Sequence, residues 1–212
     1  MIQTATGIIL RTRPLTETSL IVNWLTPEFG RLSTVAKGSR RPKSAFAGKL
    51  DLFYAADFAF VRSRRSELNT LRELNLRETH AALRQELVAF QQAGYCAALI
   101  EQTTETETPL PEIHALFAGL LDHLVGHAPK PRTVFSFELK LLRQLGLEPD
   151  PAETQLPTET QRLLAALAEA SWTELAALRA TATQARAIQQ FLHGFLIYHL
   201  GRIPKGRHAV LG

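Results

Sequence analysis

The sequence contains a single cysteine, Cys96, and no long uninterrupted apolar run among its 212 residues. One cysteine excludes an internal disulfide framework and is typical of proteins in a reducing compartment. A membrane-spanning helix needs about 18 or more consecutive apolar residues, and a signal peptide needs a basic segment before a shorter apolar run. The sequence shows neither pattern. We therefore expect a globular cytoplasmic protein with one large domain or two small ones.

Motifs of common enzyme families are also missing. The sequence has no nucleophile elbow, no phosphate-binding P-loop and no H-E-x-x-H pattern. Cys96 lies in an apolar helical stretch, where a buried thiol is far commoner than a nucleophile. His123 and His127 have the spacing of two metal ligands on one helix, but Gly126 and Pro129 indicate a fraying helix end with exposed histidines. We expect no enzyme activity, no bound metal and no cofactor.

Acidic residues are absent from residues 31–49, RLSTVAKGSRRPKSAFAGK. The strand that begins this stretch is expected to end at Gly38, before Arg40, Arg41 and Lys43. Small residues separate these charges, and no carboxylate neutralises them. Because the stretch cannot neutralise itself, we expect a loop that contacts a polyanion.

The basic residues are unevenly distributed along the chain. Residues 1–72 hold 12 Lys and Arg against 5 Asp and Glu, whereas residues 73–212 hold 12 against 15. The net charge of +4 therefore combines a basic first third with a weakly acidic remainder. This separation indicates two tasks, with the basic part facing the polyanion. Ordinary surface charge is the alternative explanation.

Residues 1–76 show the alternation of apolar and polar side chains that is typical of β-strands. Pro14 ends the first strand, and the Pro27–Gly30 sequence is typical of a tight turn. No helical pattern long enough for a parallel crossover interrupts the strands. We therefore expect a small antiparallel barrel, of which the oligonucleotide-binding (OB) fold is the common form. The expected strands are 6–13, 18–26, 31–37, 52–61 and 68–76.

From His80 onward the apolar period changes to 3.6 residues, which indicates helices. Gly146 is placed to stop a helix, and Thr158 and Ser171 are placed to cap helices at their N-termini. We expect an α+β protein with an OB-fold domain in residues 1–78 and an α-helical domain in residues 79–212. The expected helices are 80–102, 113–124, 134–145, 158–170, a short helix after Ser171, and 184–201.

Cations and aromatic rings together indicate a polyanion with bases, because single-strand binders neutralise phosphates and stack bases on rings. Phe29 and Phe46, in a turn and a loop, are the candidates for stacking. The strand aromatics are expected in the barrel core: Trp24, Tyr54, Phe58 and Phe60. Nothing indicates readout of base edges, so sequence preference should be weak. The candidate phosphate contacts are Arg11, Arg13, Arg31, Lys37, Arg40, Arg41, Lys43, Arg62, Arg64 and Arg65.

The chain resembles a known family over nearly its whole length. Residues 16–44, which include L-T-P-E-F-G-R-L-S and K-G-S-R-R-P-K-S, look like the N-terminal domain of the bacterial recombination mediator RecO. The resemblance continues through residues 110–124, through L-L-R-Q-L-G-L-E-P at residues 141–149, and through Y-H-L-G-R at residues 198–202. In this family the DNA-contacting basic loop corresponds to residues 37–43.

The resemblance implies a DNA repair and recombination mediator with an OB domain followed by helices. Family members bind single- and double-stranded DNA and anneal complementary strands, including strands coated by single-stranded DNA-binding protein (SSB). They act with RecR, and in some lineages RecF, to help load RecA, which implies a cytoplasmic, nucleoid-associated location. Many members carry a four-cysteine zinc module after the segment that matches residues 145–149. Here D-P-A-E-T-Q-L-P-T-E-T-Q stands in its place, so we expect no zinc module.

The helical part is expected to bind protein partners rather than DNA, because residues 73–212, which contain it, have a net charge of −3. The acidic SSB tail ends in apolar residues, so its dock needs an apolar groove rimmed by cations. The predicted dock lies on one helix and consists of Lys130, Arg132, Phe135, Leu139, Lys140 and Arg143. The basic end of the chain is the alternative dock or a further DNA contact: Arg202, Lys205 and Arg207.

Other functions remain open from the sequence. An RNA-binding OB protein is the first alternative, an enzyme the second and a structural adaptor the third. Annealing of SSB-coated DNA without nucleotide would distinguish a mediator from all three.

Overall fold

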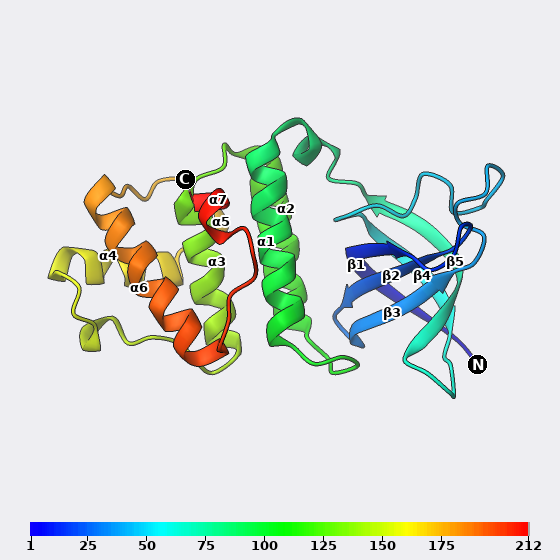
Figure 1. Ribbon diagram of the computed structural model, residues 1–212. Helices are drawn as coiled ribbons and strands as arrows, with labels where there is room; N and C mark the ends of the chain where they lie inside the picture. Colours follow the sequence, from blue (N-terminus) through cyan, green and yellow to red (C-terminus); the bar gives the residue numbers. More distant parts are fainter. Residues whose placement is uncertain (212) are drawn as a thin grey trace. The chain divides into compact units, whose positions relative to one another are not determined.

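The computed structural model describes residues 1–211 and contains an N-terminal five-stranded β-barrel followed by helices (Figure 1). This confirms the predicted α+β architecture. The strands are β1 (Ile2–Pro14), β2 (Leu20–Thr26), β3 (Gly30–Ala36), β4 (Ala55–Val61) and β5 (Leu68–Glu78). The α-helices are α1 (Leu87–Thr103), α2 (Pro111–Gly126), α3 (Pro131–Gln144), α4 (Thr158–Glu169), α5 (Trp172–Leu175), α6 (Ala182–Leu200) and α7 (Arg207–Leu211). Two short 3₁₀ helices are η1 (Ala81–Gln85) and η2 (Pro151–Glu153).

The barrel is closed in the strand order β1-β2-β3-β5-β4. The expectation of a purely antiparallel barrel was wrong for one pair, because β3 and β5 run parallel from Ser33↔Leu68 to Val35↔Thr70. The long connection after β3 places β4 beside β1, so the antiparallel β4–β5 pair returns β5 along the free edge of β3. β1 closes the barrel because one part of it pairs with β4 and the other with β2. The register of the β1–β2 pair shifts between Ile9 and Arg11, which bends this long strand.

Aromatic side chains fill the barrel, as the alternation predicts. Trp24, Phe58 and Phe60 are at most 3% exposed. The rings of Trp24 and Phe58 stack with centroids 4.1 Å apart, and the indole Nε1 donates to Thr34 Oγ1 at 2.9 Å. Tyr54 packs against this cluster but is only partly buried. The buried indole therefore has its hydrogen bond, and the barrel is a packed core rather than a channel.

The chain divides into two compact units, and the first contains a segment beyond the strands. It comprises residues 1–81 and 104–118, and the second comprises residues 82–103 and those from 119 onward. Glu107 N donates to Arg31 O at 2.9 Å, and Leu110 N donates to Pro27 O at 3.0 Å. Part of the polar segment between helices thus packs on the β2–β3 hairpin. The predicted boundary at residue 78 stays a prediction.

In the second unit α3 is central and contacts α1, α4, α6 and α7 (Figure 1). Glu138 of α3 is fully buried, and its carboxylate accepts from Arg207 Nε at 2.7 Å, Arg207 Nη2 at 2.8 Å and Tyr95 Oη at 2.6 Å. The suggestion that Arg207 serves as a dock or DNA contact was therefore wrong, because this guanidinium is 3% exposed and occupied by Glu138. A buried charge pair satisfied in this way fixes α7 against the unit's core.

Helix ends agree with the sequence in part. Ser171 and Glu174 form a capping box at α5, as predicted for Ser171, and Gly146 follows α3 with φ +70°. The predicted cap at Thr158 was wrong, because Thr158 is the first residue of α4 after Pro157. The helix expected from residue 80 begins at Leu87, after the 3₁₀ turn.

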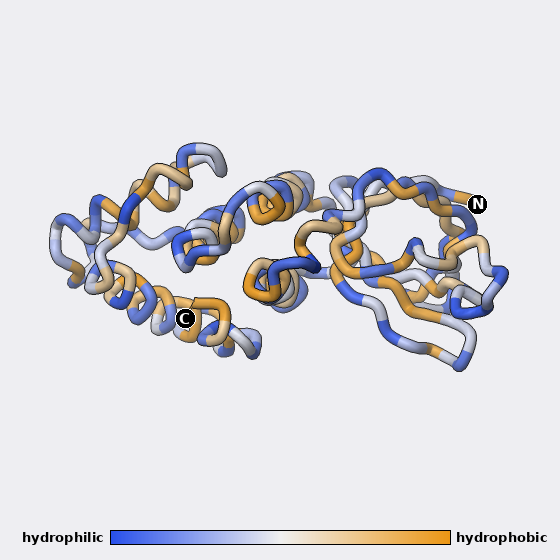
Figure 2. Tube along the Cα trace, turned by 90° about the horizontal axis from the view of Figure 1, so that it is seen from above, coloured by the Kyte–Doolittle hydropathy of each residue, from blue (hydrophilic) through white to orange (hydrophobic). Residues whose placement is uncertain are grey.

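Apolar and polar residues alternate along the helices (Figure 2). Within residues 1–211, no helix combines the length and the apolar character that crossing a membrane requires. The same part of the chain contains no group of three or more His, Cys, Asp and Glu that could hold a metal ion.

Candidate nucleic-acid interface

The basic loop, residues 37–49, follows β3 as a chain of tight turns. Gly38 has φ +65°, a conformation that favours glycine, and its carbonyl accepts from Arg41 N at 3.1 Å. The next turns are closed by Ser44 N to Arg41 O at 3.0 Å and Ala47 N to Ser44 O at 3.1 Å. Arg40, Arg41 and Lys43 are exposed, and their side chains form no ion pair within residues 1–211. The loop therefore presents uncompensated cations.

The base of this loop is attached to the β1–β2 connection. Arg40 N donates to Thr18 O at 3.0 Å, and Gly38 N donates to Ser19 Oγ at 3.2 Å. Ser19 O in turn accepts from Leu15 N at 2.9 Å. These bonds hold the start of the basic loop in place, so its cations project from a defined position.

A cavity of about 370 Å³ lies at this base. The described residues that line it include no Asp or Glu; Glu17, in the same connection, does not line it. Phosphate oxygens only accept hydrogen bonds, so hydroxyl, amide and cationic donors are the groups that suit them. We call this cavity the loop-base cavity. Its polar lining consists of Thr16, Thr18, Ser19, Lys37, Gly38 and Arg41.

The strand register divides the predicted phosphate contacts between two places. Arg13 pairs with Ile21 and Leu20 pairs with Ala36, so Arg13 lies at the barrel end that carries the basic loop. β5 begins beside Ser33, so the β4–β5 turn with Arg64 and Arg65 lies toward the opposite end of β3. At about 3.3 Å per residue, the two ends of β3 are roughly 20 Å apart. The ten candidates therefore do not form a single cluster.

Several of the predicted contacts, among them Arg11, Arg31 and Arg62, already interact with other groups of the protein. Arg31 Nε donates to Thr104 Oγ1 at 2.8 Å, and its Nη2 also donates to Thr104 O. Arg62 lies 3.4 Å from a Glu107 carboxylate oxygen and donates to Gln3 Oε1 at 2.9 Å. Their charges are thus partly used in attaching residues 104–107 to the barrel. Arg11, on β1, is exposed.

Both stacking candidates pack on the barrel. Phe29 and Phe46 are partly buried against the core cluster. The ring of Phe29 meets Phe60 edge-on with centroids 5.7 Å apart, and the Arg62 guanidinium lies 5.7 Å from its centroid. Part of the surface of each ring is therefore buried in protein contacts. Base stacking at these two positions stays a prediction.

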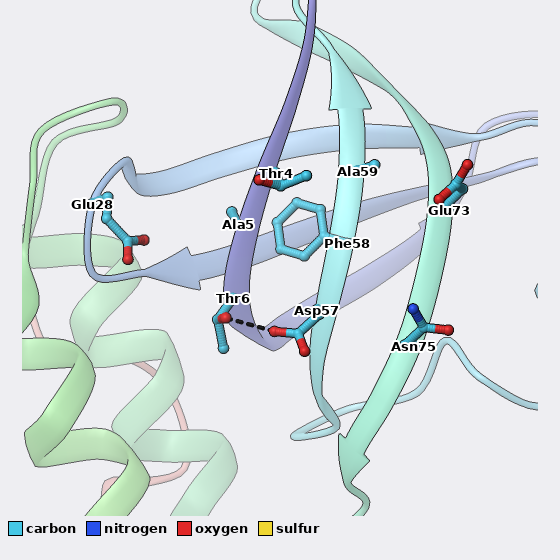
Figure 3. A pocket seen from close by; sticks show the side chains of 9 residues that line it. All are labelled: Thr4, Ala5, Thr6, Glu28, Asp57, Phe58, Ala59, Glu73 and Asn75. Atoms are coloured by element: carbon cyan, nitrogen blue, oxygen red, sulfur yellow. Dashed lines mark hydrogen bonds between the residues drawn. The ribbon is translucent and has the colours of Figure 1, made fainter.

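An acidic cavity marks a different part of the same barrel (Figure 3). It has a volume of about 370 Å³, and Glu28, Asp57 and Glu73 line it. Asp57 accepts from Thr6 Oγ1 at 2.6 Å and from Arg77 Nε at 2.7 Å, and these bonds hold the pKa of its carboxyl below the usual value. No local sequence pattern indicates this cavity, because its carboxylates come from separate segments of the chain. Its charge repels phosphate, so the barrel is electrostatically two-sided.

On α3 the predicted dock separates into two parts. Leu139 is 1% exposed, Lys140 Nζ donates to Ala168 O at 2.7 Å, and Arg143 is held by Glu148 and Glu169. These carboxylates raise the pKa of Arg143 above its usual value. The other three dock residues line a cavity of about 160 Å³, which we call the α3 cavity: Lys130, Arg132 and Phe135, with Pro131, Leu167, Ala180, Ala185 and Ile188.

Most of the chain matches the models of one known protein family. Residues 1–80 match the family model of the recombination protein O N terminal region, and residues 84–152 and 148–208 match that of its C terminal region. The chain is 31% identical over 143 residues to a DNA repair protein RecO of Rhodopirellula baltica, covering 68% of this chain and 53% of the relative. It is 34% identical over 145 residues to a DNA repair protein RecO of an Anaeromyxobacter species, covering 68% and 57%. The chain thus spans just over half the length of these relatives.

Proposed function

The chain belongs to the recombination protein O family, and from this membership and its basic loop we propose that it is a DNA-binding mediator of recombinational repair. The loop-base cavity carries the proposal, because it combines three hydroxyl groups and two cations without a carboxylate among its described lining residues. Such a cavity suits a backbone phosphate. Arg40 and Lys43, exposed beside it, extend the contact to neighbouring phosphates.

Annealing follows from this electrostatic surface. Two complementary strands repel each other through their phosphates, and bound cations reduce that repulsion as they release counterions. A protein that holds strands by their backbones leaves the base edges free to pair. No bond is made or broken, so the activity requires only positioning and charge.

Protein partners are proposed for the helical unit. The α3 cavity has an apolar interior and a cationic rim, which suits an acidic tail with apolar terminal residues, such as the SSB tail. Arg132 Nη2 and Arg179 Nη1 both donate to Ala176 O, at 3.2 Å and 3.0 Å. Burial and the nearby Arg179 charge lower the pKa of Arg132. An arriving carboxylate would relieve this repulsion between like charges. RecR, RecF and RecA remain partners inferred from the family.

A salt titration of single-stranded DNA binding tests the basic loop. The variant Arg40→Ala/Arg41→Ala/Lys43→Ala is compared with Arg72→Ala/Arg84→Ala/Arg162→Ala, which removes the same charge elsewhere. We expect the loop variant to lose about 10- to 100-fold in affinity near 0.1 M salt, and its log K against log salt slope to become shallower by roughly 2. The control variant should change the slope by less than about 0.5.

Two outcomes would contradict the proposal. Equal slopes for the loop variant and the wild type would remove the basic loop from the interface. Stronger binding of RNA than of DNA of equal length would favour the RNA-binding alternative.

A further inference from the structure

The C-terminal part of the helical region is cationic, although the region as a whole is not. Residues 175–212 contain five Lys and Arg, three His and no Asp or Glu. Residues 73–174 contain seven Lys and Arg against fifteen Asp and Glu. The net charge of −3 for residues 73–212 is thus the sum of two oppositely charged segments, and it does not exclude a polyanion contact on the second one.

Packing of α6 against α7 gathers part of this charge around one cavity. The cavity has a volume of about 420 Å³ and is lined by Arg186, Gln189, Gln190, His193 and His208. We call it the α6–α7 cavity. Residues 186, 190 and 193 are spaced four and three apart, so they share one face of α6. The rings of His193 and His208 lie with centroids 5.5 Å apart.

Two side chains of this cavity carry nitrogen atoms without a protein hydrogen-bond partner among residues 1–211. The Arg186 side chain forms no hydrogen bond or ion pair within the described chain. The Nδ1 atom of His193 is buried and has no hydrogen-bond partner among residues 1–211. A buried polar atom without a partner costs free energy, and a bound water or an anion at the cavity would offset that cost.

A buried ion pair holds this arrangement in place. Arg207, beside His208, donates to both carboxylate oxygens of Glu138 and also to Gln189 O at 3.3 Å. α7 is therefore held against the helix that carries the cavity. Glu138 is fully occupied by Arg207 and Tyr95, so it does not neutralise the cavity.

We propose that the α6–α7 cavity binds the phosphate backbone of a second nucleic-acid strand, separately from the basic loop. A guanidinium, two imidazoles and two side-chain amides are donors that suit phosphodiester oxygens, and the absence of acids from residues 175–212 favours a polyanion. The inference rests on the proposed function, because annealing requires that two strands are held at once. It assigns one strand to the barrel and the other to α6 and α7.

The test uses the full chain and two non-complementary single strands that carry a donor and an acceptor dye. Wild type should hold both strands and give energy transfer. The variant Arg186→Gln/His193→Gln should keep its affinity for a first strand within about 3-fold, lose most of the energy transfer, and anneal complementary strands about 10-fold more slowly. The matched control Arg162→Gln/His127→Gln, which removes an exposed arginine and an exposed histidine elsewhere, should behave as wild type.

A gain-of-charge variant guards against effects of misfolding. Gln190→Lys adds a cation at the same cavity, so energy transfer should persist to higher salt than in wild type. Two-strand binding and annealing that are unchanged in both cavity variants would overturn the inference. The inference would also be overturned if the cavity variants lost binding of an acidic peptide but kept binding of the second strand.

The proposed function fails differently from this inference. If DNA binding is insensitive to the basic-loop variant, the proposed function is wrong. If the loop variant loses DNA while the cavity variant still holds two strands, only the second-strand site is wrong.

Discussion

The basic loop and the α6–α7 cavity are both cationic, but the chain assembles them in different ways. In the loop, Arg40, Arg41 and Lys43 fall within four consecutive residues, so their density is visible in the sequence. In the cavity, Arg186, His193 and His208 are spread over more than twenty residues and meet only because α7 packs against α6. A cationic site within one loop can therefore be recognised from local charge density in the sequence. A site that helix packing assembles can be recognised only in the tertiary structure.

The largest expected effect comes from removing the support of the α6–α7 cavity. Glu138→Ala leaves Arg207 buried without its partner, which should cost about 3–5 kcal/mol in the free energy of unfolding. Urea denaturation followed by circular dichroism measures this loss. Glu159→Ala, which breaks an exposed pair with Arg162, should cost less than about 0.5 kcal/mol. A similar small loss in both variants would show that the buried pair does not hold α7.

A second variant tests the barrel that carries the basic loop. Gly30 has φ +59°, and a Cβ there would lie 1.7 Å from Thr108 O, so Gly30→Ala should destabilise the protein by about 3 kcal/mol. Gly48, in the basic loop, has φ +71°, and no atom of residues 1–211 would lie within 4 Å of a Cβ there. Gly48→Ala should therefore cost only about 1 kcal/mol, from backbone strain alone. Thermal melts of both variants measure the difference, and equal losses would argue against the close packing of residues 104–118.

The two ends of α3 should respond differently to an acidic peptide with apolar terminal residues. Arg132→Ala removes a cation at the α3 cavity and should weaken binding about 10-fold. Arg143→Ala should change binding less than about 2-fold, because Arg143 is already held by Glu148 and Glu169. Fluorescence anisotropy of a labelled peptide measures both affinities. Equal losses would return Arg143 to the dock, and no loss in either variant would remove the dock from α3.

The smallest expected effect concerns the acidic cavity. The folded-state pKa of Asp57 is lowered, chiefly by the Thr6 hydrogen bond and then by Arg77, so its stabilising contribution is present above the unfolded-state pKa of about 4. That contribution is lost as the pH falls through the lower folded-state pKa. Asp57→Asn should therefore cost less than about 0.5 kcal/mol at pH 7, because the pair is exposed, and the cost should become smaller as the pH is lowered toward 2.

Measurements of Asp57→Asn by urea denaturation at the two pH values test this sign. The salt slope of DNA binding should not change, because we expect the carboxylates of the acidic cavity to repel phosphate. A steeper slope in this variant would mean that DNA passes over the acidic cavity, which would weaken the two-sided description of the barrel.

Sequence patterns were most successful where the interactions are local. The five strands and the longer helices could be predicted because apolar periodicity and turn residues act over a few positions. Ser171 caps α5 for the same reason, since its partner Glu174 is three residues away. Two features depend on segments that are distant in sequence, so no local pattern predicts them. They are the parallel β3–β5 pair and the attachment of residues 104–110 to the β2–β3 hairpin.

The amino-acid sequence by itself determined a barrel, a helical region and an acid-free basic loop, because each depends on residues that are neighbours in the chain. Only the tertiary structure decided which cations remain available. In the folded chain Arg207 forms an ion pair with Glu138, 69 residues away, and Arg31 donates a hydrogen bond to Thr104. The tertiary structure also left Arg186 without a protein partner among residues 1–211 and placed His193 beside His208. Charges separated in sequence interact only where packing brings them within a few ångströms, and composition does not contain that information.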